Sequence, residues 1–411
     1  MNLPKTWSLV ALGDIAAHEK GAIRRGPFGG SLKKEIFVES GFKVYEQQNA
    51  IKDDFQIGNY FIDEDKFREM EGFNVKPHDL IISCAGTIGK VAIVPCEALP
   101  GVINQALMRI RPNPEIILCR YLKWLLESPK YQRDIFGKSA GSALKNLAAI
   151  SEIKKCKIPL PPLEEQRKIA AILDKADGVR RKRKEAIRLT EELLRSTFLE
   201  MFGDPVTNPK GWRKISLGEL LAEPLQNGAY FPKERYVEAP DGVEMVHMSD
   251  AFYNFVERGQ LKRVQVTSEE FEKYKLIPND VLIARRSLNY EGSAKPCLIS
   301  EADQPLIFES SLIRVRLNAE VIDSFFFFSY MLEPRARSAY VFPNVTKSTI
   351  SGINQAGLRR ISVLVPPMSN QKKYRDIYKK ILGTQSNYQK DYENIDNLFN
   401  SLLQRAFRGE L

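Results

Sequence analysis

The chain of 411 residues contains 61 lysines and arginines against 51 aspartates and glutamates, which gives a formal charge of +10 at pH 7, and 43% of its residues are hydrophobic. A chain of this length exceeds one ordinary hydrophobic core, so we expect a folded, soluble protein of two to four domains. The positive charge favours a polyanionic partner such as nucleic acid, although basicity alone also suits a merely soluble protein.

Disulfide-rich, zinc-binding and membrane proteins are disfavoured. The five cysteines are scattered without a C-x-x-C pair, and there are only three histidines. This usage fits reduced thiols in a cytoplasm. The longest aromatic run, "DSFFFFSYML", is shorter than the roughly 20 apolar residues that span a membrane. The start "MNLPKTWSLV" lacks the basic-then-apolar order of a signal peptide. We therefore expect a cytoplasmic protein that binds no membrane.

Residues 1–160 predict an α+β globule. Short alternating runs punctuated by glycine and proline, such as "DLIISCAGTIGKVAIVP", predict strands joined by turns, and "CRYLKWLLESPKYQRDIF" predicts a helix. We expect Asp79, and its later counterpart Asp280, to be turn residues ahead of buried strands. Trp7 and Trp212 are expected to anchor the cores.

A long helix is predicted for residues 161–203. Pro161 and Pro162 stand just before its first turn, and Gly203 marks its end. The 40 residues from 163 to 202 would form a helix of about 60 Å, at about 1.5 Å per residue. A helix of this length needs a packing partner.

The second half of the chain repeats the first. With the numbering offset by 205, "WSLVALGDI" falls on "WRKISLGEL", "QALMRIR" on "SSLIRVR", and Gln166 on Gln371. In the middle the offset is 201, where "KPHDLII" meets "IPNDVLI". We therefore predict a second α+β globule at residues 204–365 and a second long helix at residues 366–411.

Both long helices carry a heptad seam in the same phase, as a coiled coil requires. Domain termini tend to lie close together, so the chain should enter and leave the second globule at one place, which makes the helices antiparallel. The globules would then lie at opposite ends of a rod, related by a pseudo-twofold axis. Threonine and arginine make the first seam imperfect, so a short-lived packing stays an alternative. The seam residues are Ala176, Arg180, Arg183, Ile187, Thr190, Leu194, Thr197 and Met201, and then Ile381, Gln385, Tyr388, Tyr392, Ile395, Phe399, Leu402 and Ala406.

The basic run "RRKRK" at residues 180–184 has two interpretations. The run could contact phosphates if the helix follows DNA. It could equally form a solvated helix face, with the stems of Arg180 and Arg183 extended along the seam. The sequence alone does not choose between them.

The order of these segments resembles a known family. A globule is followed by "IPLPPLEEQRKIAAILDKAD" and a helix that ends "LLRSTFLEMFGDP", and then by a second globule and a helix that ends "SLLQRAFRGEL". Over the whole chain this order is similar to the specificity (S) subunits of type I restriction-modification systems. "RRGPFGGSLKK" and "SCAGTIGKVAIV" are also similar to stretches in many target-recognition domains of that family, whereas "VPPMSNQKKYR" is a drifted copy of the first junction.

The resemblance implies that each globule is a target-recognition domain that reads one part of a split, asymmetric double-stranded DNA site, with the helices as a ruler between them. It also implies two adenine-N6 methyltransferase (M) subunits bound to the helices, and motor-nuclease (R) subunits that join for cleavage. The chain itself would do no chemistry and bind no cofactor, because S-adenosylmethionine, ATP and Mg²⁺ would be bound by the partner subunits.

Two other functions stay open, namely a stand-alone DNA-modifying enzyme and a coiled-coil scaffold that joins proteins. Against the enzyme, "LPPLE" and "VPPMS" are not the Asp/Asn-Pro-Pro-Phe/Tyr motif of an adenine methyltransferase. "CAGTIGKVA" also departs from the phosphate loop G-x-x-x-x-G-K-S/T at its first glycine and its last position. Failure to bind any DNA would favour the scaffold.

Seven loops carry side chains suited to DNA. Arginine and lysine beside glycine can approach a phosphate closely, arginine can read guanine, and the amides of glutamine and asparagine can read adenine. For each loop a solvated surface is the alternative. The candidates in the first globule are Arg24, Arg25, Lys33, Lys34, Gln47, Asn49, Thr87, Lys90, Ser142, Lys145 and Asn146. Those in the second globule are Gln226, Asn227, Tyr230, Arg285, Arg286, Asn289, Tyr290, Lys347, Ser348 and Thr349.

Overall fold

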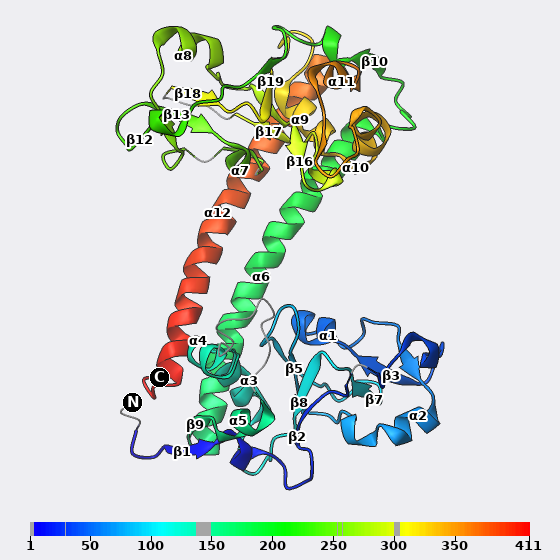
Figure 1. The fold of residues 1–411 in the computed structure, drawn as a ribbon, viewed down its shortest axis with the longest axis vertical. Coiled ribbons are helices and arrows are strands. Elements are labelled where there is room, and N and C mark those ends of the chain that lie inside the picture. Colours follow the sequence, from blue (N-terminus) through cyan, green and yellow to red (C-terminus); the bar gives the residue numbers. More distant parts are fainter. Residues whose placement is uncertain (1–3, 29, 137–148, 253, 257, 300–304) are drawn as a thin grey trace. The chain divides into compact units, whose positions relative to one another are not determined.

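The computed structural model describes residues 4–28, 30–136, 149–252, 254–256, 258–299 and 305–411. The chain divides into two compact units, Met1–Lys184 with Lys390–Leu411, and Glu185–Gln389. Each unit therefore holds one globule and one stretch of each long helix, α6 (Leu163–Phe202) and α12 (Met368–Ala406) (Figure 1). Among the described residues, no helix is long and apolar enough to cross a membrane.

The described residues of the first globule form three small sheets. Its strands are β1 (Ser8–Ala11), β2 (Ile23–Arg25), β3 (Phe42–Tyr45), β4 (Phe61–Ile62), β5 (Leu80–Ser83), β6 (Val91–Ile93), β7 (Gly101–Ile103), β8 (Leu107–Ile110) and β9 (Lys157–Leu160). Its helices are α1 (Gln47–Lys52), α2 (Glu64–Glu69), α3 (Cys119–Glu127), α4 (Pro129–Tyr131) and α5 (Ile150–Lys155), with a π-helical turn at Gln132–Phe136. The largest sheet is antiparallel, in the order β2-β8-β5-β6. β3 lies between β4 and β7, and β1 pairs with β9 just before α6.

The globule of the second unit has the same plan. Its strands are β10 (Arg213–Ser216), β11 (Gln226–Asn227), β12 (Tyr236–Val237), β13 (Val243–Val246), β14 (Arg263–Val264), β15 (Val281–Ala284), β16 (Arg286–Ser287), β17 (Pro296–Leu298), β18 (Leu306–Phe308), β19 (Leu312–Val315), β20 (Ser351–Gly352) and β21 (Ser362–Val365). Its helices are α7 (Met248–Ala251), α8 (Ser268–Tyr274), α9 (Ser324–Leu332), α10 (Pro334–Ala336) and α11 (Gln355–Arg359), with a π-helical turn at Arg337–Val341. The antiparallel sheet has the order β11-β19-β15-β17, and β10 pairs with β21 before α12.

The predicted repeat is confirmed element by element. At the larger of the two predicted offsets, β1, β8, β9, α3 and α6 recur as β10, β19, β21, α9 and α12. At the smaller offset, β3 and β5 recur as β13 and β15, as the middle of the sequence predicted. β6 recurs as β17 at the larger offset again, so the second copy regains four residues between β15 and β17.

The core of the first globule includes both long helices. Trp124 of α3 packs edge-on against Phe399 of α12, and Tyr121 packs edge-on against Phe407, with ring centroids 5.5 Å apart in both pairs. Ile169 of α6 belongs to the same buried cluster. The helices therefore stabilise the globule by burying its apolar face as well as their own seam.

The second unit is built alike. Phe202 of α6 meets Phe326 of α9 edge-on at 4.7 Å between ring centroids and Tyr374 of α12 at 5.4 Å. The role predicted for the two tryptophans is also confirmed, because Trp7 lies in the first core and Trp212 packs against the second.

Within each unit the two helix stretches run antiparallel (Figure 1). In the first unit Arg180 pairs with Asp396 at 3.2 Å and Arg183 with Asp391 at 3.3 Å, so residue numbers fall along α12 as they rise along α6. In the second unit Phe198 meets Tyr374. All the predicted seam residues are buried or half-buried, which confirms the antiparallel coiled coil.

Residues near the two ends of the chain meet in the first unit as the internal linker does in the second. Gly203 and Gly409, after the long helices, have φ of +78° and +76°, in the left-handed region that favours glycine. A Cβ on Gly203 would lie 2.8 Å from Pro209, and one on Gly409 would lie 2.3 Å from Pro4. The two prolines are one repeat offset apart and the two glycines differ from that offset by one residue, so the same contact follows each long helix.

Candidate DNA-binding surfaces

A buried ion pair holds the turn before β5 in the first unit and the turn before β15 in the second. Asp79 and Asp280 each accept the backbone N–H of the residue three positions earlier, at 2.8 and 2.9 Å. Asp79 also pairs with Arg111 at 2.7 Å, and Asp280 with Arg316 at 2.8 Å. The predicted turn role is confirmed. The ion pair was not predicted, and it commits both carboxylates to the scaffold.

The register of the sheets places two pairs of candidate residues at equivalent positions. Arg24 lies opposite Arg109 in β8, and Gln226 lies opposite Arg314 in β19, where Arg109 and Arg314 are equivalent in the repeat. Arg25 and Asn227 follow in the same way. The edge strand of this sheet therefore carries arginines in the first unit, and the equivalent edge strand in the second unit carries amides.

Each pair leads into a turn that only glycine can make. A Cβ on Gly26 would lie 1.8 Å from the carbonyl oxygen of Asn104, and one on Gly228 would lie 2.3 Å from that of Glu309. Two residues after each glycine stands an aromatic side chain turned to solvent, Phe28, which is 94% exposed, or Tyr230.

Phe28 was not among the residues predicted from the sequence. Tyr230 was, because its loop parallels a loop of the first globule. Alignment of "RRGPFGG" with "QNGAYFP" would have placed Phe28 opposite Tyr230, but the offset there differs from both offsets that the longer segments define.

Gln47 lies under the loop of residues 84–90, which joins β5 to β6 and carries Thr87 and Lys90. Its Oε1 is 3.7 Å from the position that a Cβ on Gly86 would take. That oxygen is buried and has no hydrogen-bond partner among the described residues. Thr87 and Lys90 of this loop are exposed. An unpaired buried acceptor costs free energy, so a donor from a bound molecule would suit this position.

Asn49, two residues after Gln47, is engaged within the protein. It is 1% exposed, its Oδ1 accepts the N–H of Glu46, and its Nδ2 donates to the carbonyl oxygens of Asp54 and Ile57, at 2.8 to 3.0 Å. Both ends of its amide are therefore bonded to the backbone on either side of α1. For this reason Asn49 is not among the DNA contacts that we propose. The sequence could not separate this capping role from base reading.

The remaining candidates of the first globule are less constrained. Lys33 and Lys34 are exposed at the start of a short helical turn. Ser142, Lys145 and Asn146 lie outside the described residues.

In the second unit, two candidate loops meet. β16, which contains Arg286, pairs with β20, which follows the loop of Lys347, Ser348 and Thr349. Lys347 Nζ lies 5.3 Å from the centre of the Tyr290 ring, close enough for a cation–π interaction. Arg285, Arg286 and Asn289 are half-buried or exposed along the same loop, beside the exposed Leu288.

Gln226 and Asn227 are partly engaged within the protein. Gln226 Nε2 donates to the carbonyl oxygen of Lys273 at 2.8 Å. Asn227 Oδ1 accepts from Gln355 at 3.2 Å. Each amide keeps one end for another partner.

The arginines of the basic run 180–184 are paired within the first unit. Arg180 and Arg181 share Asp177, and Arg181 also reaches Asp53 at 3.2 Å. These ion pairs favour the second interpretation, in which the stems of Arg180 and Arg183 extend along the seam, over phosphate contacts.

Comparison with known proteins identifies the family. A model of the type I restriction modification DNA specificity domain matches residues 4–189 and again residues 209–395. The chain belongs to this family.

This chain is similar in sequence to specificity subunits over nearly its full length. It is 25% identical to the EcoKI specificity subunit of Escherichia coli K12, across 90% of this chain and 85% of that subunit. It is 24% identical to the putative MjaX specificity subunit of Methanocaldococcus jannaschii, across 100% and 94%. Its fold is similar to the type I S subunit from M. genitalium, with a TM-score of 0.54, 15% identity, and 99% and 96% coverage. A chain from a structure of type I R-M complex assembly gives a TM-score of 0.54, 19% identity and full coverage of both chains.

Membership in the specificity family confirms the resemblance read from the sequence. It makes the chain a DNA-recognition component and not a catalytic subunit. Within the described ranges, no three His, Cys, Asp or Glu side chains are grouped so that they could hold a metal ion.

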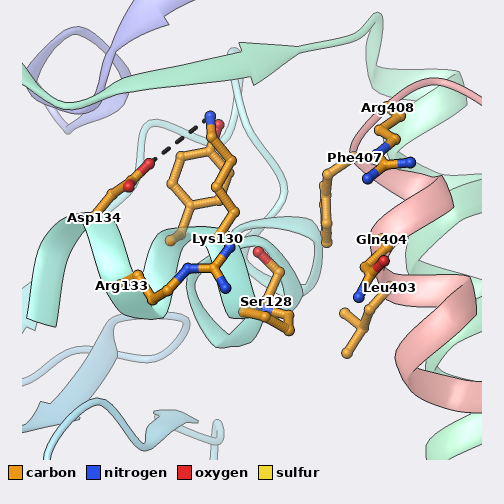
Figure 2. A pocket seen from close by; sticks show the side chains of 10 residues that line it. Ser128, Lys130, Arg133, Asp134, Leu403, Gln404, Phe407 and Arg408 are labelled. Atoms are coloured by element: carbon orange, nitrogen blue, oxygen red, sulfur yellow. Dashed lines mark ion pairs between the residues drawn. The ribbon is translucent and has the colours of Figure 1, made fainter. Parts of the chain in front are cut away.

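A crevice of about 430 Å³ opens in the first unit between α4 and the end of α12. Figure 2 shows Lys130 and Asp134, paired at 3.9 Å, on one wall, and Leu403 and Phe407 on the other. None of its lining residues is a candidate DNA contact, so the crevice is separate from the loop surfaces described above.

Proposed function

We propose that this specificity subunit reads a split, asymmetric DNA site, one part with each unit. The observation that carries the proposal is the pair of equivalent loop surfaces with different side chains. Arg24 and Arg25 stand where the second unit has Gln226 and Asn227. Arginine bonds best to guanine, and glutamine or asparagine to adenine, so the two parts of the site should differ in sequence.

Each surface combines groups for bases with groups for the DNA backbone. In the first unit Gln47, with its unpaired buried oxygen, is a candidate base reader beside Thr87 and Lys90. Lys33 and Lys34 are exposed and suited to phosphates. We also include Ser142, Lys145 and Asn146, from the sequence alone.

In the second unit the base readers are proposed to be Arg285, Arg286 and Asn289, on the loop that joins β15 to β17. Lys347 and Tyr290 form the neighbouring wall, together with Ser348 and Thr349. The exposed aromatic side chains of the two units, Phe28 and Tyr230, would stack on or wedge beside bases.

We further propose that the chain works with two adenine-N6 methyltransferase subunits, which dock on the helices α6 and α12, and with motor-nuclease subunits, in the cytoplasm. S-adenosylmethionine, ATP and Mg²⁺ would be held by those partners. The helices would set the length of the spacer between the two parts of the site. Residues 1–160 and 204–365 would act as the exchangeable recognition domains, and residues 161–203 and 366–411 as the spacer helices.

The test is co-expression of the chain with its methyltransferase subunits, followed by genome-wide mapping of N6-methyladenine. A split, asymmetric motif is expected. Exchange of residues 1–160 for another globule of the family, with the residues that face Phe399 and Phe407 kept, should change one part of the motif only. An unchanged motif after the exchange would defeat the proposal.

Two further outcomes would support other functions. Methyl transfer or cleavage by the isolated chain would make it an enzyme. Absence of DNA binding even with the methyltransferase subunits would make it a scaffold. For the proposed function, binding should weaken steeply with salt, because lysine and arginine contacts to phosphate release counterions.

A further inference from the structure

In each unit a side chain at the same position of the repeat bonds to the end of a candidate reading loop. Gln132 and Arg337 are the first residues of the two π-helical turns and are equivalent in the repeat. Gln132 Nε2 donates to the carbonyl oxygens of Gly89 and Leu126, at 2.8 and 2.6 Å. Arg337 Nη1 donates to those of the equivalent residues, Ala294 and Met331, at 3.2 and 2.9 Å. In both units one side chain thus ties the end of the loop to the helix behind it.

The loops themselves differ in length. Between β5 and β6 the first unit has the seven residues 84–90, whereas between β15 and β17 the second has the eleven residues 285–295. The four extra residues are the ones that restore the larger offset of the repeat. They also lengthen the loop that carries Asn289 and Tyr290.

Arg337 makes two hydrogen bonds that Gln132 does not. Its Nη2 donates to the carbonyl oxygens of Glu291 and Ser293, at 2.9 and 2.7 Å. These residues lie in the longer loop. A guanidinium can serve several acceptors in one plane, whereas an amide nitrogen has two donors. The side chain is therefore matched to the loop that it holds.

The charge of Arg337 is buried. Arg337 is 8% exposed, and within the described ranges it forms no ion pair with a carboxylate. Burial lowers the pKa of its guanidinium. A buried charge that is compensated by carbonyl groups and one aromatic ring is still costly, so a neutral residue would be expected here if packing were the only role.

The backbone at the end of the loop also needs support. Gly89 has a φ of +84°, and its equivalent Ala294 has a φ of +56°, in the left-handed region that a side chain disfavours. The second unit keeps this conformation without glycine, and Arg337 bonds directly to the Ala294 carbonyl. The bond therefore opposes relaxation of the loop at that residue.

Arg337 also contacts the proposed reading surface through Phe342. The Arg337 guanidinium lies 5.0 Å from the centre of the Phe342 ring. Phe342 in turn stacks on Tyr290 at 4.9 Å between ring centroids and accepts the Tyr290 hydroxyl hydrogen on its carbonyl, at 3.1 Å. Lys347 lies over the other ring of this stack.

We infer that Gln132 and Arg337 are positioning residues for DNA reading, each matched to its own loop, and that Arg337 fixes the longer loop 285–295 in its reading geometry. This inference rests on the proposed function, since the loop must face DNA for its geometry to affect specificity. Arg337 itself would not touch the bases.

The test compares Arg337→Met and Arg337→Gln with a matched control, Arg335→Gln. Arg335 lies two residues away, is exposed, and pairs with Asp204 outside the loop. Hydrogen–deuterium exchange on the full chain reports on the loop without DNA. In Arg337→Met, amide exchange in residues 286–294 should rise by about tenfold or more, because three loop carbonyls lose their donor. Arg337→Gln should raise exchange less, since glutamine can keep the bond that Gln132 makes.

The second readout is the methylation motif obtained with the co-expressed methyltransferase subunits. Arg337→Met should make degenerate only the part of the motif that exchange of residues 1–160 leaves unchanged, and Gln132→Leu should affect only the other part. Unchanged loop exchange, or equal loss in both parts, would overturn the inference. If Arg337→Met fails to fold, Arg337→Lys, which keeps the charge but not the planar fork, carries the same expectations.

The proposed function and the role of Arg337 fail in different ways. A wild-type complex that yields no split motif would defeat the proposed function. The exchange measurement would still decide whether Arg337 holds the loop.

Discussion

Gln166 and Gln371 occupy the same place in the two halves of the chain and make the same three hydrogen bonds. Gln166 Oε1 accepts the N–H of Leu118 at 2.8 Å, and its Nε2 donates to the carbonyl oxygens of Ile116 and Pro161, at 3.0 and 2.9 Å. The bonds of Gln371 go to the residues one repeat later, at 2.7 to 3.2 Å. Each glutamine ties the first turn of a long helix to the strand end before it and to the segment that precedes α3 or α9.

Replacement of either glutamine by leucine should destabilise the protein strongly. Gln166→Leu or Gln371→Leu leaves one buried N–H and two carbonyl groups unpaired in a position with no exposure, at a cost of about 2–4 kcal/mol. Urea unfolding of the full chain would measure the loss. Gln404→Leu, at an exposed position of α12, serves as the control and should change stability by less than about 0.5 kcal/mol. Equal behaviour of control and test variants would contradict the role of the junction.

The buried ion pair before the central strand should matter in the same way. Asp79→Ala leaves Arg111 without its nearest buried carboxylate, and we expect a loss of about 3 kcal/mol. The matched control is Glu69→Ala, which removes an exposed pair with Lys66 and should cost less than about 0.5 kcal/mol. Thermal unfolding of the three proteins would decide, and a small effect of Asp79→Ala would show that Glu19 alone holds Arg111.

Much of the fold could be predicted from the sequence, because the repeat and the heptad period can both be read directly from the order of the residues. The two offsets placed the strands of both globules, and the heptad phase identified the seam. The contacts of the helices with the globule cores were not predicted, because no local pattern shows that Phe399 and Phe407 pack on α3. Asn49 and Gln47 illustrate the same limit at the site. Both are amides in "YEQQNAI", and only the folded chain shows that one is a cap and the other has an unpaired oxygen.

The exposed aromatic residues should contribute to DNA binding but not to stability. Phe28→Ala and Tyr230→Ala should each weaken binding of the assembled complex to a duplex with the mapped motif by about tenfold, as expected for the loss of one stacking contact. Fluorescence anisotropy would measure the dissociation constants. Unfolding midpoints should stay unchanged, since both side chains lie in solvent. The control is Leu99→Ala, another exposed apolar side chain, and a similar loss of affinity there would argue against specific contacts.

The buried thiols predict a distinct pattern of labelling and of alkaline stability. Burial raises the pKa of Cys84 and of Cys297 to about 12, from the ordinary value of 9.0. The folded protein therefore holds these protons more tightly than the unfolded chain. Their contribution to stability should be complete below pH 9 and should decline as the pH rises from 9 towards 12.

At pH 8 a thiol reagent should modify the exposed Cys96 quickly, and it should modify Cys84 and Cys297 only after denaturation. Mass spectrometry of the labelled peptides gives the order. Fast modification of Cys84 in the folded protein would contradict the burial on which the prediction rests.

A circular permutation should preserve the fold. Five residues separate Gly203 from Pro209, and a direct bond between Leu411 and Met1 would also leave five residues between Gly409 and Pro4. With that bond made and the chain opened between the exposed Val206 and Thr207, the unfolding midpoint should stay within a few degrees of the parent. A chain opened instead inside β15, which is fully buried, should not fold. Failure of the first permuted chain to fold would show that the contact between Gly409 and Pro4 cannot be replaced by a covalent linker.

In each unit the end of one long helix meets the first residues of the globule through the same glycine and proline, Gly409 with Pro4 and Gly203 with Pro209. In the second unit residues 204–208 also link the two covalently, so the same junction is built with a linker in one unit and by packing in the other. A rearrangement that moved the chain opening from one junction to the other should therefore leave the loops and side chains of each unit as they are.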